Sequence, residues 1–307
     1  NGKFYTVHSE PWNAQTPDFR GPTAPYNDGG LVSVLSEWTA DDPSAASFSG
    51  TSRELFRVYF PTSVHGMQEI AFNPNAAVGS ADYGMLYVCI GEGGSYLEGY
   101  ADNEHRLDSP MGTIFRIDPA GNNSANGNYG IPSDNPWAQS SDDSVLGEIY
   151  AYGFRNPHRI SWDIGGTGRG YIGDIGETQV EELNLLVAGA DYGFPEREGT
   201  FVLDPDAPQN NDEVFPLPSN DAEFGYTYPV AQYDHDEGIA IVLGPVYRGD
   251  LAASFLDGYL FFGDIAWGRV FAVKESDLAL GSQASFDEVR LELNGIAGEL
   301  RSFVGSS

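Results

Sequence analysis

The sequence predicts an all-β protein made of many short strands. It contains 38 Gly and 19 Pro in 307 residues, and both residue types favour turns over long helices. Apolar, aromatic-rich runs of four to eight residues alternate with Gly, Asp and Asn turns, which is typical of β-strands. Helical periodicity is scarce, and the 41% hydrophobic content of a chain this long can form a large core.

A repeat is present within these runs. Segments 85–92, 169–177 and 258–268 each follow a Gly-containing turn and contain a Gly-Glu or Gly-Asp pair. The pairs begin at positions 91, 173 and 263, so they lie 82 and 90 residues apart. This is about twice the ~40–45 residues of one propeller blade. Further strands are expected at 112–118, 148–154, 181–187, 240–249 and 268–274.

The strand spacing therefore predicts a six-bladed β-propeller. One expectation is that the last blade is incomplete. We expect residues 1–307 to form a single domain, because no linker divides the chain. Two loop-rich excursions are predicted at 1–53 and 119–147, and residues 203–223 are also rich in Asp, Pro and Asn. An irregular sandwich or barrel is the alternative. Loops on one face of a propeller converge on its central channel, so the functional residues are expected there.

Charge and composition exclude several classes of partner. The chain carries 15 Lys and Arg against 45 Asp and Glu, a formal net charge of -30, which argues against nucleic acid and anionic membranes. No run of 18 apolar residues is present, so no membrane insertion is expected. The chain begins at Asn1, and we expect a processed protein that is secreted or periplasmic. The one cysteine, Cys89, lies in an apolar run and is expected to be a buried thiol.

Two segments contain candidate functional groups. His65 lies between a loop and the apolar run 69–72, where imidazole can accept a proton near neutral pH; a surface or hydrogen-bonded loop histidine is the alternative. Arg155 and Asn156 follow the expected strand 148–154 and precede Pro157. A guanidinium and an amide suit a small ligand with several carboxylates or carbonyls. The alternative is that Arg155 pairs with Glu148 or Asp163.

An acidic segment follows. Residues 173–184 contain Asp174, Glu177, Glu181 and Glu182. Carboxylates at this density repel one another unless they are solvated or bridged by a hard cation such as Ca²⁺. Both interpretations remain open from these residues alone.

Several segments together resemble the soluble PQQ-dependent glucose/sorbosone (aldose sugar) dehydrogenases, which are six-bladed propellers. Residues 153–163 are similar to the family's Gly-x-Arg-Asn-Pro segment, and 173–199 to its Gly-Asp, Glu-Glu-Ile-Asn and Tyr-Gly-Trp-Pro segment. Residues 229–271 resemble its later Tyr-x-His and Tyr-Arg-Gly elements. The resemblance extends over about residues 60 to 275.

The resemblance implies a function and roles for individual residues. An aldose or related sugar would be oxidised at the anomeric carbon to a lactone, with the hydride passing to PQQ. His65 would be the base that removes the proton of the anomeric hydroxyl. Arg155 and Asn156 would hold the quinone oxygens, and Arg155 would also stabilise the charge of the reduced cofactor.

The resemblance also implies calcium. Main-chain oxygens of Gly176 and Glu177 would bind the Ca²⁺ that holds PQQ, and Glu182 with Tyr192 would serve a second, structural Ca²⁺. The sequence departs from the family pattern after His65, where Gly66-Met67 replaces a Gly-Gly pair, and at Phe194, which replaces a Trp. The substrate would be a small sugar, and the sequence does not identify the electron acceptor.

Two alternatives are carried beside the dehydrogenase. One is a non-catalytic propeller module that binds carbohydrate or protein, because a fold does not determine a function. The other is a calcium-dependent lactonase-type hydrolase, which would require Glu, Asp and Asn side chains converging on one cation.

Overall fold

The computed structural model describes residues 2–12, 15–23, 30–203 and 214–304. It shows an all-β chain in two compact units, Asn1–Phe154 and Arg155–Ser307. Most strand pairs are antiparallel, which confirms the predicted class. In the described part of the chain, no helix is long and apolar enough to cross a membrane.

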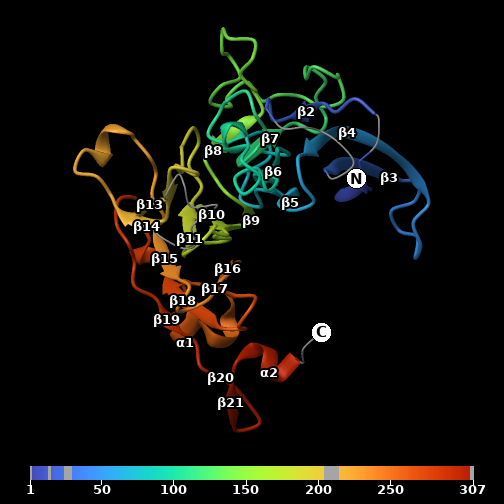
Figure 1. Ribbon diagram of the computed structural model, residues 1–307. Helices are drawn as coiled ribbons and strands as arrows, with labels where there is room; N and C mark the ends of the chain where they lie inside the picture. Colours follow the sequence, from blue (N-terminus) through green and yellow to red (C-terminus); the bar gives the residue numbers. More distant parts are fainter. Residues whose placement is uncertain (1, 13–14, 24–29, 204–213, 305–307) are drawn as a thin grey trace. The chain divides into compact units, whose positions relative to one another are not determined.

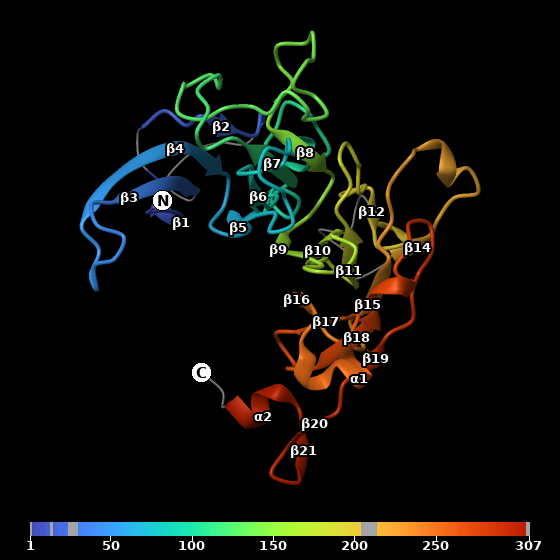
Figure 2. The ribbon, with the colours of Figure 1, turned by 180° about the vertical axis from the view of Figure 1, so that it is seen from behind.

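The first unit contains two four-stranded sheets (Figure 1). One has the order β1-β3-β4-β2, and the other has the order β5-β6-β7-β8. Their strands are β1 (Lys3–Pro11), β2 (Phe19–Arg20), β3 (Leu31–Ala40), β4 (Gly50–Phe60), β5 (Met67–Phe72), β6 (Leu86–Ile90), β7 (Thr113–Ile117) and β8 (Ile149–Tyr152). A short 3-10 helix, η1 (Ala101–Asn103), follows β6. Strands β5 to β8 lie side by side in both views (Figures 1 and 2).

The core of the first unit is aromatic and aliphatic. Phe56, Phe115 and Tyr129 are completely or almost completely buried and are packed in one cluster. Cys89 is a buried thiol on β6, as predicted. The predicted loop-rich excursion at 1–53 is wrong in part, because β1, β3 and the start of β4 lie there. The Ser, Thr and Glu residues of β3 and β4 obscured the strand pattern in the sequence, although six of the ten residues of β3 are buried.

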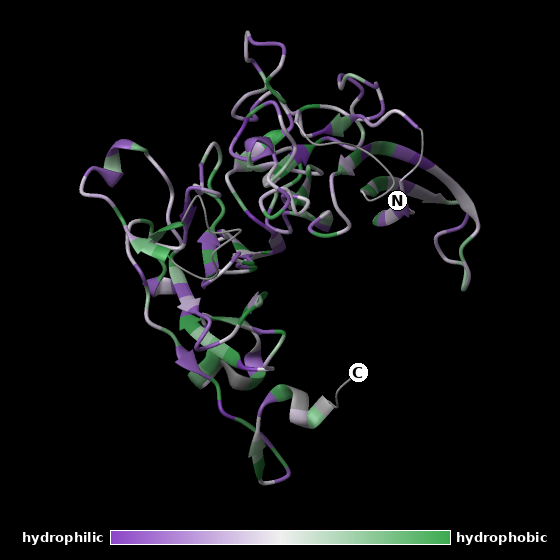
Figure 3. Ribbon diagram, in the orientation of Figure 1, coloured by the Kyte–Doolittle hydropathy of each residue, from purple (hydrophilic) through white to green (hydrophobic). Residues whose placement is uncertain are grey.

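The second unit contains two four-stranded sheets, with the orders β15-β11-β10-β9 and β16-β17-β18-β19. Their strands are β9 (Pro157–Trp162), β10 (Gly170–Asp174), β11 (Val180–Leu185), β15 (Ala231–Asp234), β16 (Ile241–Val246), β17 (Tyr259–Asp264), β18 (Val270–Lys274) and β19 (Asp287–Glu288). Tyr233, Phe262 and Phe271 pack together in its core. In Figure 3 hydrophobic segments are visible along strands of this unit.

Smaller elements complete the second unit. A three-stranded sheet contains β12 (Arg197–Glu198), β13 (Phe201–Leu203) and β14 (Val214–Pro216), and a hairpin contains β20 (Leu291–Leu293) and β21 (Ile296–Gly298). The helical segments are η3 (Asp221–Glu223), η4 (Asp250–Ala252), α1 (Ala253–Leu256), η5 (Glu275–Asp277) and α2 (Leu300–Val304). Residues 119–147 contain no named strand, as expected. Of the stretch 203–223, residues 204–213 lie outside the described residues.

Candidate functional site

His65 lies in the loop directly before β5, as the sequence predicted. Its backbone is left-handed, with φ of 50°, a conformation that residues other than Gly rarely adopt. The loop after β6 holds it there, because the Gly93 amide donates a 3.1 Å hydrogen bond to the His65 carbonyl. Gly91 permits this close approach, since a Cβ at this position would lie 2.5 Å from the same oxygen. The two loops therefore fix the position of His65.

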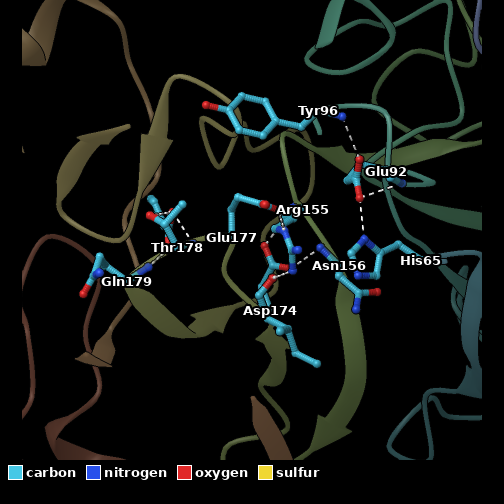
Figure 4. A network of polar contacts seen from close by, with 12 residues as sticks. His65, Glu92, Tyr96, Arg155, Asn156, Asp174, Glu177, Thr178 and Gln179 are labelled. Atoms are coloured by element: carbon cyan, nitrogen blue, oxygen red, sulfur yellow. Dashed lines mark hydrogen bonds and ion pairs between the residues drawn. The ribbon is translucent and has the colours of Figure 1, made fainter. Parts of the chain in front are cut away.

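The imidazole of His65 is hydrogen-bonded to the carboxylate of Glu92 (Figure 4). Nδ1 contacts the carboxylate, which is itself fixed by the amides of Gly94 at 2.7 Å and Tyr96 at 3.1 Å. Glu92 is only 1% exposed, and the His65 side chain is 19% exposed. A carboxylate accepts hydrogen bonds, so it favours the tautomer in which Nδ1 carries the proton and Nε2 has a free lone pair. This arrangement suits a general base.

Sequence reasoning did not select Glu92, although the Gly-acid repeat contained the signal. Glu92, Asp174 and Asp264 are all buried, and each follows or ends the second strand of its four-stranded sheet. Each carboxylate also accepts main-chain N–H groups of a nearby loop. The acidic residues of the repeat are thus buried carboxylates that hold neighbouring loops in place. Among these three described residues, Glu92 is the one that also contacts a histidine.

Arg155 and Asn156 begin the second unit, in the loop before β9. Asp174 at the end of β10 anchors them, because its carboxylate accepts the amide of Arg155 at 3.1 Å and that of Asn156 at 2.7 Å. The Ile175 amide returns a 3.1 Å bond to the Asn156 carbonyl. Figure 4 shows Asp174 directed at these two residues. The backbone that presents the Arg-Asn pair is therefore fixed by β10.

The guanidinium of Arg155 pairs with Glu177 and donates a 3.1 Å hydrogen bond to the Ile175 carbonyl. The two alternative partners of Arg155 that the sequence suggested, Glu148 and Asp163, accept hydrogen bonds from other residues. Glu148 accepts from Tyr129 at 2.6 Å, and Asp163 accepts from Arg248 at 2.8 Å. Arg155 is 8% exposed, so its guanidinium is fixed by protein contacts rather than solvated.

Asn156 has an amide oxygen that is buried and has no hydrogen-bond partner among the described residues. The residue is 4% exposed. A buried polar atom without a partner costs about 1–3 kcal/mol, and such atoms in a native structure call for an explanation. A polar ligand bound beside the amide would remove this cost, so the Arg155–Asn156 pair fits a polar cofactor.

Gly176 and Glu177 lie in the turn between β10 and β11. A Cβ at Gly176 would overlap the carbonyl oxygen of Val180, so this tight turn requires glycine. In the described residues no group of three or more His, Cys, Asp or Glu side chains could hold a metal ion. A calcium ion here would therefore be coordinated by main-chain oxygens and by oxygens of a bound cofactor, both of which are suitable ligands for Ca²⁺.

The acidic segment is buried rather than solvated. Asp174, Glu181 and Glu182 are 4%, 0% and 7% exposed, and the Glu177 side chain is 6% exposed. Asp174 and Glu182 are cross-strand partners on β10 and β11. Burial, together with the neighbouring Glu182 carboxylate, raises the pKa of Asp174, and burial likewise raises the pKa of Glu182. Plain solvation, one of the two interpretations of this segment, is therefore wrong.

Glu182 and Tyr192 have separate hydrogen-bond partners. The Glu182 carboxylate accepts the Gly199 amide at 2.6 Å and the Asn184 side chain at 2.8 Å. The Tyr192 hydroxyl donates to the Leu185 carbonyl and accepts the Val187 amide at 3.2 Å. Both residues are buried. The Glu182 contacts join β11 to the turn after β12, whereas the Tyr192 contacts join the end of β11 to the loop that follows it.

Comparison with known proteins supports the resemblance. Residues 48–290 match the family model described as Glucose / Sorbosone dehydrogenase. The chain is 29% identical over 281 residues to the HIPL1 protein of Arabidopsis thaliana, covering 83% of this chain. It is 29% identical over 269 residues to the HIPL2 protein of the same plant, covering 79% of this chain. The matches span only 37% and 36% of those two relatives.

Solved structures share the fold. The apo form of the soluble aldose sugar dehydrogenase from Escherichia coli matches with a TM-score of 0.63 and 18% identity, over 94% of this chain and 68% of that one. A glucose dehydrogenase matches with a TM-score of 0.62 and 19% identity, over 96% and 69%. The PQQ-bound aldose sugar dehydrogenase of Streptomyces coelicolor matches with a TM-score of 0.50 and 20% identity, over 85% and 63%. From the family match over most of its length, this chain belongs to the glucose/sorbosone dehydrogenase family.

Proposed function

We propose that this protein oxidises an aldose or related sugar at the anomeric carbon to a lactone, with PQQ and Ca²⁺ as cofactors. The observation that carries the proposal is the His65–Glu92 pair, in which a buried carboxylate holds a partly exposed imidazole. The family match and the PQQ-bound structural neighbour support the class of reaction. We also propose that the blades form one six-bladed propeller domain.

The geometry of His65 supports its proposed role as the base. Oxidation of a hemiacetal carbon to a lactone removes one hydride from carbon and one proton from the hydroxyl. The Nε2 lone pair of His65 would accept that proton, and the Glu92 carboxylate would stabilise the resulting imidazolium. Because Glu92 is held by two main-chain amides, the imidazole needs little reorganisation when it becomes charged.

Arg155 and Asn156 would hold the cofactor. When bound, PQQ supplies a quinone that accepts the hydride. The fixed guanidinium of Arg155 would stabilise negative charge, and the unpartnered side-chain amide oxygen of Asn156 would gain a polar contact. The main-chain oxygens of Gly176 and Glu177 would bind Ca²⁺. We also propose a second, structural Ca²⁺ at Glu182 and Tyr192, which would share oxygens that form hydrogen bonds to Asn184 and Leu185 in this structure.

The lactonase alternative finds less support, because the described residues contain no cluster of acidic side chains that could hold its cation. We also propose that the protein is secreted or periplasmic. A direct test is reduction of an artificial electron acceptor by the full chain with a panel of aldoses, with and without PQQ and Ca²⁺. Turnover that needs both cofactors and is lost in His65→Ala supports the proposal, and the absence of turnover with every sugar contradicts it.

A further inference from the structure

Glu198 on β12 has an unusual set of hydrogen bonds. The residue is 1% exposed. Its Oε1 atom accepts the amides of three consecutive residues in the turn after β10: Thr178 at 3.0 Å, Gln179 at 2.7 Å and Val180 at 2.7 Å. Its Oε2 atom contacts the Thr178 amide and hydroxyl, both at 3.2 Å. One carboxylate thus holds most of the turn from a neighbouring sheet.

These bonds determine the direction of carbonyl groups. The N–H and C=O of a trans peptide point in opposite directions. The Thr178 amide shares its peptide with the Glu177 carbonyl, so that carbonyl is directed away from Glu198. The carboxylate also packs against Gly176, where a Cβ would lie 2.8 Å from Oε1. The turn is therefore held from one side, and its Glu177 oxygen is presented on the other.

We propose that Glu198 is a positioning residue that orients the Glu177 carbonyl toward a divalent cation, with Ca²⁺ as the ion. This inference rests on the function proposed above, which places calcium at this turn. Outer-shell groups that orient metal ligands typically change metal affinity by about 10–100-fold when they are altered. Glu198 is also an acidic residue, and a negative charge would attract a cation even if it did not orient the Glu177 carbonyl. The test must therefore distinguish orientation of the carbonyl from electrostatic attraction.

Two substitutions separate these effects. Glu198→Gln removes the charge but keeps an Oε1 atom that can accept the same three amides. Glu198→Asp keeps the charge, but its side chain is one methylene shorter and cannot reach all three. Glu196→Gln is the matched control, because Glu196 lies two residues away and accepts from the Tyr226 hydroxyl instead.

The measurement is calorimetric titration of CaCl₂ into the chelated full chain in the presence of saturating PQQ. We expect Glu198→Asp to weaken calcium binding by about tenfold or more. We expect Glu198→Gln to remain within about threefold of the wild type, and Glu196→Gln to be unchanged. Hydrogen exchange at the amides of residues 178–180 should accelerate in Glu198→Asp alone, and this readout is independent of activity.

The outcomes are distinct. Wild-type affinity in Glu198→Asp, or equal weakening in Glu198→Gln and Glu198→Asp, overturns the positioning role while leaving calcium binding intact. If the wild type itself binds no calcium, the proposed function fails, and this inference fails with it. Thermal unfolding checks that each variant folds. If Glu198→Asp does not fold, the test is the ¹³C chemical shift of the Glu177 carbonyl in the wild type. The proposal is overturned if this chemical shift does not change when calcium is added.

Discussion

The imidazole Nδ1 of His65 pairs with the buried carboxylate of Glu92. The pair joins the loop before β5 to the loop after β6, and two main-chain amides fix the carboxylate. It is the arrangement by which an acidic residue orients a histidine base. The account of this protein depends on it, and the first prediction tests it.

Glu92→Gln should lower kcat for sugar oxidation by about 100-fold or more, because the amide no longer stabilises the imidazolium or selects the tautomer. KM should change much less, since Glu92 is buried behind His65. Steady-state kinetics measure both constants. Glu98→Gln is the control, because Glu98 is exposed in the same loop. An equal loss of kcat in both variants would contradict a specific role for Glu92.

Asn156→Ala should weaken PQQ binding by about tenfold, the loss of roughly one hydrogen bond. Its unfolding free energy without cofactor should change by less than about 1 kcal/mol, because removing the unpartnered buried amide oxygen relieves its desolvation cost. Titration of PQQ and urea denaturation measure the two quantities. A large loss of stability with unchanged PQQ affinity would show that Asn156 is a structural residue.

Gly91→Ala should perturb His65 although Gly91 is not in the left-handed region. Its new Cβ would lie 2.5 Å from the His65 carbonyl oxygen, so one of the two loops must shift. Overpacking of this kind costs about 1–3 kcal/mol, and kcat should fall as His65 moves. Gly147→Ala is a milder control, because its new Cβ would lie no closer than 3.2 Å to another atom, the nearest being a side-chain carbon of Ile131. Equal activity in both variants would show that the His65 loop tolerates displacement.

The pH dependence of stability should include a contribution from Glu37 on β3. Burial would raise its pKa, but hydrogen bonds from Arg53, Lys3 and Tyr5 outweigh burial and lower the pKa from 4.5 to about 2. A depressed pKa stabilises the folded state above the unfolded value, and this stability is lost as the pH falls from about 4.5 toward 2.

Glu37→Gln tests this assignment. At neutral pH it should lower the unfolding free energy by about 1–3 kcal/mol, because it removes a charged acceptor. Between pH 4.5 and 2 its stability should fall less steeply than that of the wild type. Urea denaturation across this range measures both effects, and parallel pH profiles would assign the acid sensitivity to other carboxylates.

Much of the strand order was predictable from local pattern. The runs at 85–92, 112–118 and 169–177 correspond to β6, β7 and β10, because buried strands there are apolar and end at Gly turns. Strand β9 was not predicted; it begins at Pro157, and Pro is disfavoured inside strands. Pro can occupy the first position of a strand because its missing N–H is not needed there.

The candidate site was predictable only in part. His65, Arg155 and Asn156 were found from residue type and from the resemblance. Glu92 and Glu198 were not, because their significance lies in burial and in amides that they accept from other loops. Such contacts depend on tertiary structure and have no fixed sequence spacing. The Gly-acid repeat indicated the position of Glu92 without its partner.

The measurement that tests the central claim most directly is titration of PQQ into the chelated full chain, with and without Ca²⁺, followed by quinone absorbance. The account predicts tight binding that requires Ca²⁺ and is lost in Arg155→Ala, whose guanidinium is held by Glu177 and Ile175. The absence of binding at micromolar PQQ, with the protein shown to be folded, would contradict a PQQ-dependent dehydrogenase and favour a binding module on the same fold.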